Sequence, residues 1–331
     1  METLEGGELC FPQLLNSSCR KPMRPRSEAV LLHILLSSIS LLTVALNLLV
    51  IISISHFRQL HTPTNLLLLS LAVSDLAVGV VKIPGEGSRF IGACWFLGDP
   101  MCALYHFIGF VIVAASVGNM VLISIDRYVA ICDPLHYPTK ITLRKIQISV
   151  CLCWLCSVFC NGLILRDHLK QPDKYKSCDG ECVLVVDYIE GAVDLVLNFV
   201  GPITVIIVLY MRVFVVAVSQ ARAMRFHIVS VPSQGTVTVT AKKSEMKAAR
   251  TLGVVIVVFL MCFFPFYFAL FLARDTLINV SSWSILSCLL FFNSCLNPVI
   301  YAFLYPWFRK AVKIIGTLQI LQPGSCAANV L

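Results

Sequence analysis

Long apolar stretches separated by short clusters of charge dominate the 331-residue chain. Seven stretches are almost free of Asp, Glu, Lys and Arg, and each, with its flanks, reaches the roughly 20 residues that a membrane-spanning helix needs. They cover residues 29–57, 61–81, 100–125, 146–165, 195–211, 251–273 and 276–308. The pattern predicts an all-α membrane protein, a bundle of seven transmembrane helices.

The last stretch exceeds one span, so its helix should break near Pro306 and Trp307. Residues 309–319 then alternate basic and apolar residues, which is typical of an amphipathic helix on a membrane surface. The chain therefore divides into a tail (1–28), a seven-helix domain (29–305) and a short amphipathic eighth helix with a terminal tail (306–331).

Composition supports this assignment. Hydrophobic residues make up 58% of the chain and charged residues 13%, about half the charged fraction of soluble proteins. A soluble core cannot absorb so much apolar surface, which excludes a soluble or disordered chain.

The orientation follows from charge and from glycosylation motifs. With the N-terminus outside, inner segments hold 15 Lys and Arg against 11 in outer ones, a weak bias in the expected direction. Asn16 and Asn279 each begin an Asn-x-Ser glycosylation motif, and both face outside in this orientation. Six of the 15 cysteines lie on the same side, where disulfides persist.

Asp75 is the one charged residue inside the second stretch, and a charge at membrane depth is a functional hypothesis by default. It either hydrogen-bonds to neighbouring helices or forms a cation site with Ser116, Asn293 and Asn297, which fall at similar depth. Oxygen ligands of this kind suit a sodium ion or a proton.

Two further motifs suggest movement. Arg127, in Asp126-Arg127-Tyr128, needs a carboxylate when the helices pack, and either Asp126 or Glu245 can supply it. A pair that forms and parts is a two-state switch, although an interfacial Arg that only reaches water is the simpler interpretation. Pro298 and Tyr301 belong to a segment that Pro298 predisposes to bend.

The chain resembles the rhodopsin-like G-protein-coupled receptors through Asp126-Arg-Tyr, Asn297-Pro-x-x-Tyr301, Trp154, Asp75 and the pair Cys102 and Cys182. It resembles the trace amine-associated receptors more narrowly through Asn293-Ser-x-x-Asn-Pro-x-x-Tyr-x-x-x-Tyr305-x-Trp307-Phe308, Glu245–Gly253 and Cys94-Trp95-Phe-Leu-Gly98. The likeness runs from Ala29 to about Ile315.

The resemblance implies a plasma-membrane receptor for a small-molecule amine that couples to a heterotrimeric G protein, of the stimulatory type. It also implies partnership with arrestin and a receptor kinase within a lipid bilayer, a role for Tyr210 in the switch, and neither a cofactor nor a nucleic-acid partner. By the same resemblance, Cys102 should bond to Cys182 and Cys19 to Cys178, with Cys10 as the alternative partner of Cys178.

One expected residue is missing. Receptors of this kind carry an Asp on the third helix, eighteen residues before the Arg of Asp-Arg-Tyr, and Gly109 occupies that position here. On the fifth helix, Asp194 should face the bundle, because a charge facing lipid is unfavourable. The chain then resembles fish trace-amine receptors that carry their acid on the fifth helix, although Asp194 as a loop acid remains an alternative.

Other residues compete for or complete the ligand site. Glu86 is a second acid, but Lys82 lies one helical turn away and should neutralise it. His106 is a ligand contact or a hydrogen-bonding core residue. Aromatic and apolar side chains attract cations or pack, and here they are Phe110, Val113, Phe266, Tyr267 and Phe291.

The sequence therefore predicts an olfactory-type amine receptor whose ligand pairs with Asp194. Within that class the rival is a non-amine agonist. A transporter or channel would need inverted repeats with paired broken helices, which the sequence lacks. A membrane enzyme would need a nucleophile or metal motif, such as Gly-x-Ser-x-Gly or His-Glu-x-x-His, and neither run is present.

Overall fold

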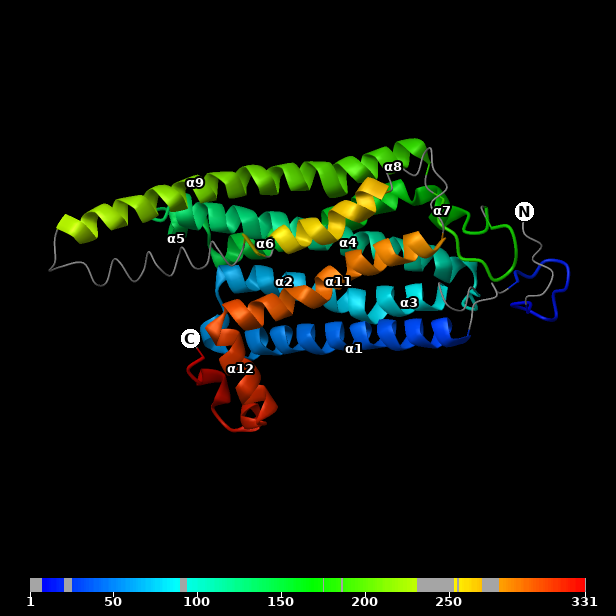
Figure 1. The fold of residues 1–331 in the computed structure, drawn as a ribbon, viewed down its shortest axis with the longest axis horizontal. Helices are drawn as coiled ribbons and strands as arrows, with labels where there is room; N and C mark the ends of the chain where they lie inside the picture. Colours follow the sequence, from blue (N-terminus) through cyan, green and yellow to red (C-terminus); the bar gives the residue numbers. More distant parts are fainter. Residues whose placement is uncertain are drawn as a thin grey trace.

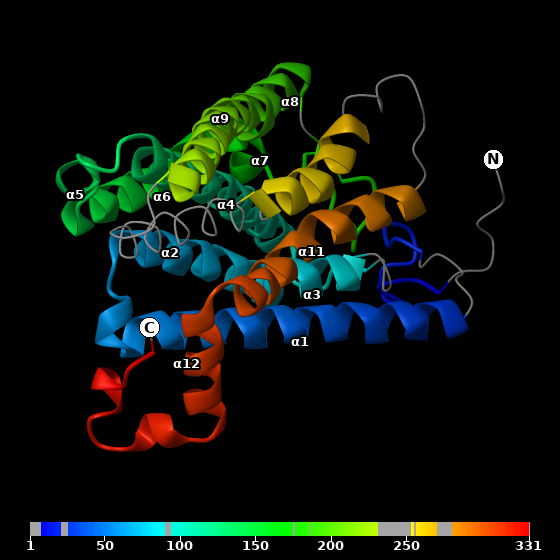
Figure 2. The same cartoon turned by 60° about the vertical axis from the view of Figure 1, so that its left-hand side comes forward.

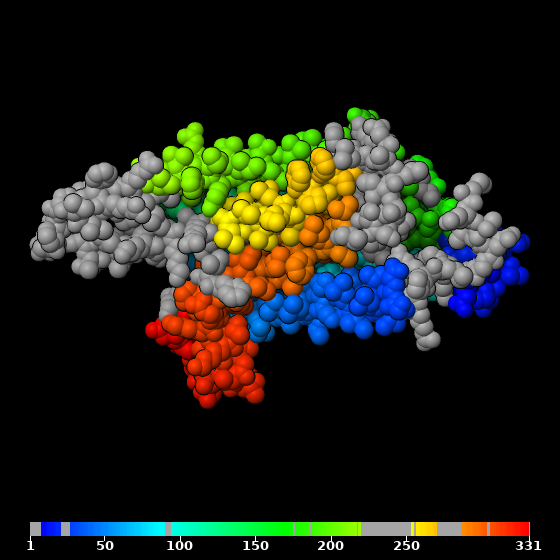
Figure 3. Space-filling model, in the orientation of Figure 1, coloured from blue at the N-terminus to red at the C-terminus, as the bar shows by residue number. Residues whose placement is uncertain are grey.

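The computed structural model describes residues 8–20, 26–89, 94–174, 176–185, 187–230, 253–254, 256–269 and 280–330. Its described residues are almost entirely helical, and their few β contacts are isolated bridges near the N-terminus. The long helices run side by side along one axis (Figure 1), as the apolar pattern predicts for an all-α bundle. In the space-filling view α9, the helix Ile256–Ala269, α11 and α1 form successive bands across one face (Figure 3).

The long helices match the expected spans in number and order, within the part of the chain that is described. They are α1 (Arg26–His56), α2 (Pro63–Ala77) with its continuation, α4 (Asp99–Cys132), α6 (Leu143–Ile164), α9 (Gly201–Ser230) with its preceding turns, Ile256–Ala269, and α11 (Val280–Leu304). The short helices are η1 (Arg58–Leu60), α5 (Tyr137–Lys140) and α7 (Arg166–Lys170).

The bundle has two distinct ends. One end carries residues 8–20, 94–98 and 176–185 together with α7, and we call it the disulfide end (Figure 1). The opposite end carries α5 and the amphipathic helix α12 (Pro306–Gly316), and we call it the α12 end (Figure 2).

The second helix is longer than the sequence predicts. A stretch ending at residue 81 was expected, yet the helix continues through the π-helical turn η2 (Val78–Lys82) and α3 (Ile83–Gly87). The charge that marked the predicted end, Lys82, is buried in an ion pair with Glu86. An ion pair formed inside the helix hides the charge from the membrane, so the charge does not end the span.

The third helix extends beyond its predicted end, and the fifth helix begins before its predicted start. Helix α4 passes residue 125 and reaches Cys132, because the charges of Asp126 and Arg127 pair with each other. The fifth helix begins at Tyr188 rather than residue 195, in α8 (Tyr188–Leu195), and passes through the π turn η4 (Val196–Val200) into α9. Residues 188–194 are therefore helical and not part of the preceding connection.

The seventh helix ends where the prolines predict. Helix α11 stops at Leu304, Tyr305 is extended, and α12 starts at Pro306, at an angle of 96° to the helix before it. Trp307 and Phe308 are buried against the bundle, while Arg309 and Lys310 are exposed. This break agrees with the predicted amphipathic eighth helix, which projects from the bundle in Figure 2.

Three disulfides tie the disulfide end together. Two join Cys102 to Cys182 and Cys19 to Cys178, the pairs that the family resemblance predicts. The third joins Cys10 to Cys94, so the alternative pairing of Cys10 with Cys178 is wrong. Backbone hydrogen bonds from Cys10 to Cys19 and from Cys19 to Asp179 hold both segments beside the long connection before α8, which brings the bonded thiols together.

We predict that the Cys10→Ala, Cys94→Ala double variant loses stability. The bridge spans 84 residues of sequence, and a native disulfide of this kind contributes about 2–4 kcal/mol, mainly by restricting the unfolded chain. Thermal unfolding of the detergent-solubilised protein measures the difference.

The matched control is Cys151→Ala, which removes an exposed free thiol and should leave the unfolding temperature unchanged. An unfolding temperature equal to that of the native protein for the double variant would contradict the prediction.

Candidate functional site

Asp126 and Arg127 lie at the α12 end of α4 and form a closed polar cluster. The Asp126 carboxylate is fully buried and accepts hydrogen bonds from Arg127 Nε at 2.9 Å, Tyr137 Oη at 2.8 Å and Thr64 Oγ1 at 3.0 Å. Thr64 stands near the start of α2, which Thr62 caps, and Tyr137 begins α5. Among the described residues, Asp126 is therefore the carboxylate that holds Arg127.

The other switch residues surround this cluster. Tyr128 packs on Ile131 and Val213, which joins α4 to α9. Tyr210 lies against Gly253, where any Cβ would collide with the Tyr210 ring. Tyr301 is buried, with its ring 5.9 Å from that of Tyr305. Pro298 lies inside α11, and Glu245 lies outside the described residues.

Asp75 lies in the centre of the bundle among buried amides. Asn297 Nδ2 donates to Asp75 Oδ2 at 2.8 Å, while Asp75 Oδ1 has no hydrogen-bond partner among the described atoms. The side-chain oxygens of Asn293 and Asn297 are also buried without partners, as is the amide nitrogen of Asn293, and Ser116 is buried. Buried oxygens without donors suit a small hard cation, so this cluster fits the predicted sodium site.

Asp194 is buried near the disulfide end of the fifth helix, with 6% of its surface exposed. Asn198 Nδ2 donates to its Oδ1 at 2.7 Å, and the described residues include no Lys, Arg or His paired with it. Asp187 and Glu190, on the same predicted stripe, instead form a capping box at the start of α8. Only Asp194 of the three acids enters the bundle.

Aromatic side chains accompany Asp194. Phe199 lies in η4, the turn that follows Asp194. Its ring stacks on that of Tyr267 at 4.5 Å, and Tyr267 meets Phe266 edge-on at 5.5 Å. Tyr267, Phe266, Phe199, Val113 and Phe291 share one apolar cluster. Phe110 is half-buried on α4.

Glu86 lies in a second polar cluster, between the second and third helices. Its Oε1 accepts hydrogen bonds from Lys82 at 3.1 Å and from Tyr105 Oη at 2.9 Å, and Arg89 contacts both oxygens at 3.3 and 3.1 Å. Gly85 makes room for the Tyr105 ring, because any Cβ there would lie 2.3 Å from it. The Glu86 carboxylate is therefore the counter-charge of both Lys82 and Arg89.

Sequence reasoning placed Lys82 beside Glu86 but missed Arg89 and Tyr105. The spacing of Glu86 and Arg89, one helical turn, is a signal that was available. Tyr105 lies on a different helix, so only the packing of α4 against α3 brings it to this carboxylate.

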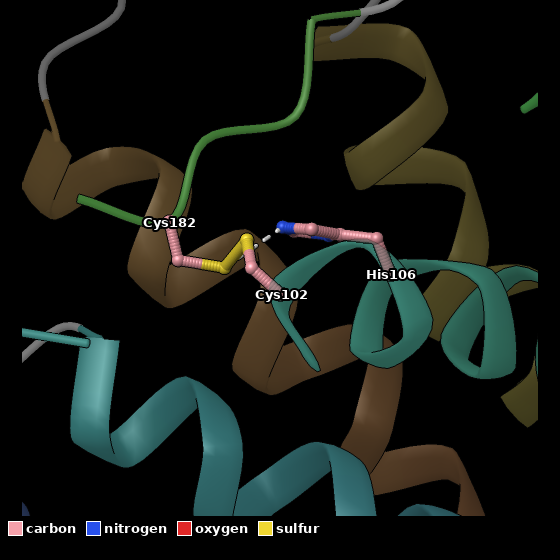
Figure 4. A group of neighbouring side chains, drawn as sticks. All are labelled: Cys102, His106 and Cys182. Carbon is pink, nitrogen blue, oxygen red and sulfur yellow. Dashed lines mark hydrogen bonds between the residues drawn. A yellow bond between two sulfur atoms is a disulfide. The ribbon is translucent and has the colours of Figure 1, made fainter. Parts of the chain in front are cut away.

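His106 is the last of the predicted ligand residues. It lies one turn after Cys102 on α4, and its ring points at the Cys102–Cys182 disulfide, with Nε2 3.5 Å from Cys182 Sγ (Figure 4). Both sulfurs are bonded to each other, so neither is a thiolate that could hold a metal ion. The ring of His168 lies 5.9 Å away, and burial lowers the pKa of His168.

Lys176, in the long connection between α7 and α8, forms two ion pairs at the disulfide end. Lys176 Nζ lies 2.8 Å from Asp99 at the start of α4 and 2.9 Å from Asp179. These hydrogen bonds raise the pKa of Lys176 to about 12. The disulfide end is thus fixed to α4 by charge as well as by sulfur.

Comparison with known proteins supports the resemblance noted from the motifs. Residues 46–301 match the family described as 7 transmembrane receptor (rhodopsin family). The chain is 35% identical to trace amine-associated receptor 13c of Danio rerio, over 98% of this chain and 96% of that protein. It is 34% identical to trace amine-associated receptor 4 of Mus musculus, over 98% and 95% respectively.

We predict that Glu86→Gln destabilises the protein far more than Lys82→Met. The first change leaves the buried Lys82 and the half-buried Arg89 without a counter-charge, and breaking a buried ion pair costs about 3–5 kcal/mol. The Lys82→Met change leaves Glu86 paired with Arg89, which already contacts both of its oxygens. Thermal unfolding of both variants in detergent compares them.

Tyr105→Phe serves as control, because it removes one hydrogen bond to Glu86 but no charge, and its effect should be about 1 kcal/mol. Equal stability of the Glu86→Gln and Lys82→Met variants would show that the cluster is not held by its charge balance.

Proposed function

Because the chain belongs to the trace amine-associated receptors, a subfamily of the rhodopsin-like G-protein-coupled receptors, we propose that it is a cell-surface receptor for small amines of the olfactory type. The amine is held by Asp194, and the signal passes to a heterotrimeric G protein. The names of its relatives, the trace amine-associated receptors, support the ligand class.

The observation that carries this proposal is a buried carboxylate that has no ion-pair partner among the described residues. Asp194 has the amide of Asn198 as its hydrogen-bond partner and no ion pair within the described part of the chain. A buried carboxylate is costly without an opposite charge. The ammonium of a ligand would supply that charge, and the stacked rings of Phe199, in the turn that follows Asp194, and Tyr267 would add cation–π attraction.

Signalling requires the opposite end of the bundle to open. Arg127 donates to Asp126 and to Thr64, and Tyr137 of α5 donates to the same Asp126 carboxylate, which joins α2, α4 and α5. We propose that a bound amine favours a state in which this cluster parts and a cleft opens for a G protein of the stimulatory type. A ligand shifts the equilibrium only as far as it binds one state more tightly. Arrestin and a receptor kinase would bind the same end.

The orientation that this requires places the disulfide end outside the cell, in the plasma membrane. Three disulfides at one end support an oxidising environment there. Asn16 is exposed on the same end, as a glycosylated residue must be. Asn279, the second predicted glycosylation position, lies outside the described residues.

We also propose that the Asp75 cluster binds sodium. A bound ion would neutralise the buried Asp75 carboxylate. Asp75, Ser116, Asn293 and Asn297 would hold it, and Asn47, which donates to the backbone oxygen of Ser294, would fix α1 against α11 beside it.

Replacing Asp194 by Asn tests the amine site. The change keeps the shape and removes the charge, so the half-maximal concentration of an active amine should rise at least about 30-fold, equivalent to about 2 kcal/mol. Cyclic-AMP responses of cells with equal surface expression give the measurement.

Glu190→Gln is the matched control. It removes one negative charge a helical turn from Asp194, and Gln can keep the capping box at Asp187. Its responses should equal those of the native receptor. If Asp194→Asn responds to amines as the native receptor does, the proposed site is wrong.

Replacing Asp75 by Asn tests the ion site. Sodium chloride should raise the unfolding temperature of the purified receptor above its value in choline chloride, because an ion bound only by the folded state stabilises it. The Asp75→Asn variant should show no such difference. A sodium effect that persists in this variant would refute the site.

A further inference from the structure

The position that carries an acid in many amine receptors contains a cation of the chain itself. A Cβ built on Gly109 would lie 2.8 Å from both Nζ and Cδ of Lys82 and 2.9 Å from Cε. The lysine side chain, which starts on the second helix, therefore lies directly against the bare backbone of α4. Any other residue at position 109 would force the Lys82 side chain to move.

The groups around the Lys82 ammonium, aromatic rings and a carboxylate, are of the kind that bind amines in proteins. Its Nζ lies 4.0 Å from the centre of the Tyr105 ring and 5.6 Å from that of Phe291, and Glu86 pairs with it at 3.1 Å. A ligand ammonium placed here would meet an ammonium already present. Repulsion between like charges therefore excludes a cation from this half of the site.

The cluster carries more positive than negative charge. Glu86 is the one acid paired with both Lys82 and Arg89 in the described residues, which leaves one positive charge in excess. Tyr105 donates to Glu86 and adds no charge. This cluster is a positive pole buried at the disulfide end.

Asp194 forms the opposite pole. It belongs to α8, and α4 contacts both η2, which carries Lys82, and η4, which follows Asp194. Phe291, whose ring lies 5.6 Å from the Lys82 ammonium, and Phe199, in the turn that follows Asp194, belong to the same apolar cluster. The two poles thus lie on elements that both pack against α4, each with an aromatic ring of this cluster on or against its own element.

We propose that the receptor recognises a zwitterionic amine, whose ammonium pairs with Asp194 and whose other end carries an anion that pairs with Lys82. This inference rests on the proposed amine site at Asp194 and adds the chemical class of the ligand. Lys82 is itself paired with Glu86, and Arg89, which contacts both oxygens of Glu86, would keep that carboxylate paired when the Lys82 ammonium turns to the anion of the ligand. A carboxylate is the simplest such anion.

Matched probes separate this ligand class from other amines. For each of several chain lengths, the ω-amino carboxylic acid is compared with the alkylamine and the diamine of the same number of carbons, for example 5-aminopentanoic acid, pentylamine and cadaverine. The series covers different separations of the two poles. Cyclic-AMP responses are measured in cells with equal surface expression.

At the best chain length, we expect the amino acid to be at least about ten times as potent as the corresponding alkylamine, because its carboxylate adds a partly buried ion pair with Lys82. The diamine should be the weakest probe, because it brings a second cation to Lys82. Lys82→Met should remove the advantage of the amino acid and leave or improve the response to the alkylamine.

Lys176→Met is the matched control. It removes a lysine at the same end of the bundle, but one paired with Asp99 and Asp179 in the outer connection. It should leave the ratio between amino acid and alkylamine unchanged. Gly109→Ala gives a second, independent test, because its Cβ displaces the Lys82 side chain and should reduce the amino-acid advantage as Lys82→Met does.

The outcomes distinguish the two proposals. Alkylamines or diamines that act through Asp194 and exceed every amino acid would overturn the zwitterion proposal alone. An unchanged ratio in Lys82→Met would do the same. If none of the probes activates the native receptor, or if Asp194→Asn leaves their potency unaltered, both the zwitterion proposal and the amine site are wrong.

Discussion

An ionisable side chain within a membrane protein must find an opposite charge or hydrogen-bond partners, because the surrounding hydrocarbon offers neither. This requirement organises the bundle at three levels. At the α12 end Asp126 holds Arg127, and in the centre Asn297 donates to Asp75. At the disulfide end, one carboxylate, that of Glu86, is the counter-charge of two cations, Lys82 and Arg89. Asp194, across α4, has an amide as its partner.

The apolar pattern predicts the number, order and approximate position of the helices, because the need for about 20 apolar residues is a property of the bilayer. It fails at helix ends that contain paired charges. The second helix passes Lys82 and the third passes Asp126, and in both cases the partner lies within the same helix. A search for uncharged stretches ends the predicted helix at Lys82 or at Asp126, because it does not take into account that these charges are paired. Spacing, which places Lys82 one turn from Glu86, corrects part of this error.

Contacts between distant segments are less accessible from one sequence. The motifs of a known family supply Cys102–Cys182 and Cys19–Cys178, whereas Cys10–Cys94 depends on how the tail folds across the disulfide end. Tyr105 reaches Glu86 only because α4 packs on α3. Burial of Asp194 was predictable, since the alternative was to face lipid. The partner of Arg127 was left open between two acids, and packing of α2, α4 and α5 around Asp126 decides it for the described residues.

Gly109 and Lys82 are best understood as one arrangement. An aspartate at position 109 would have to share its space with the lysine ammonium, since even a Cβ would lie 2.8 Å from Nζ. Such an acid would form an ion pair with Lys82, cancel the excess positive charge of the cluster and lose its own capacity to hold a ligand. Glycine together with lysine has the opposite effect. Lys82 of the second helix then places a cation against the third helix, and the acid of the proposed site is Asp194 on the fifth helix. The proposed site therefore has the opposite polarity to that of a receptor with its acid on the third helix.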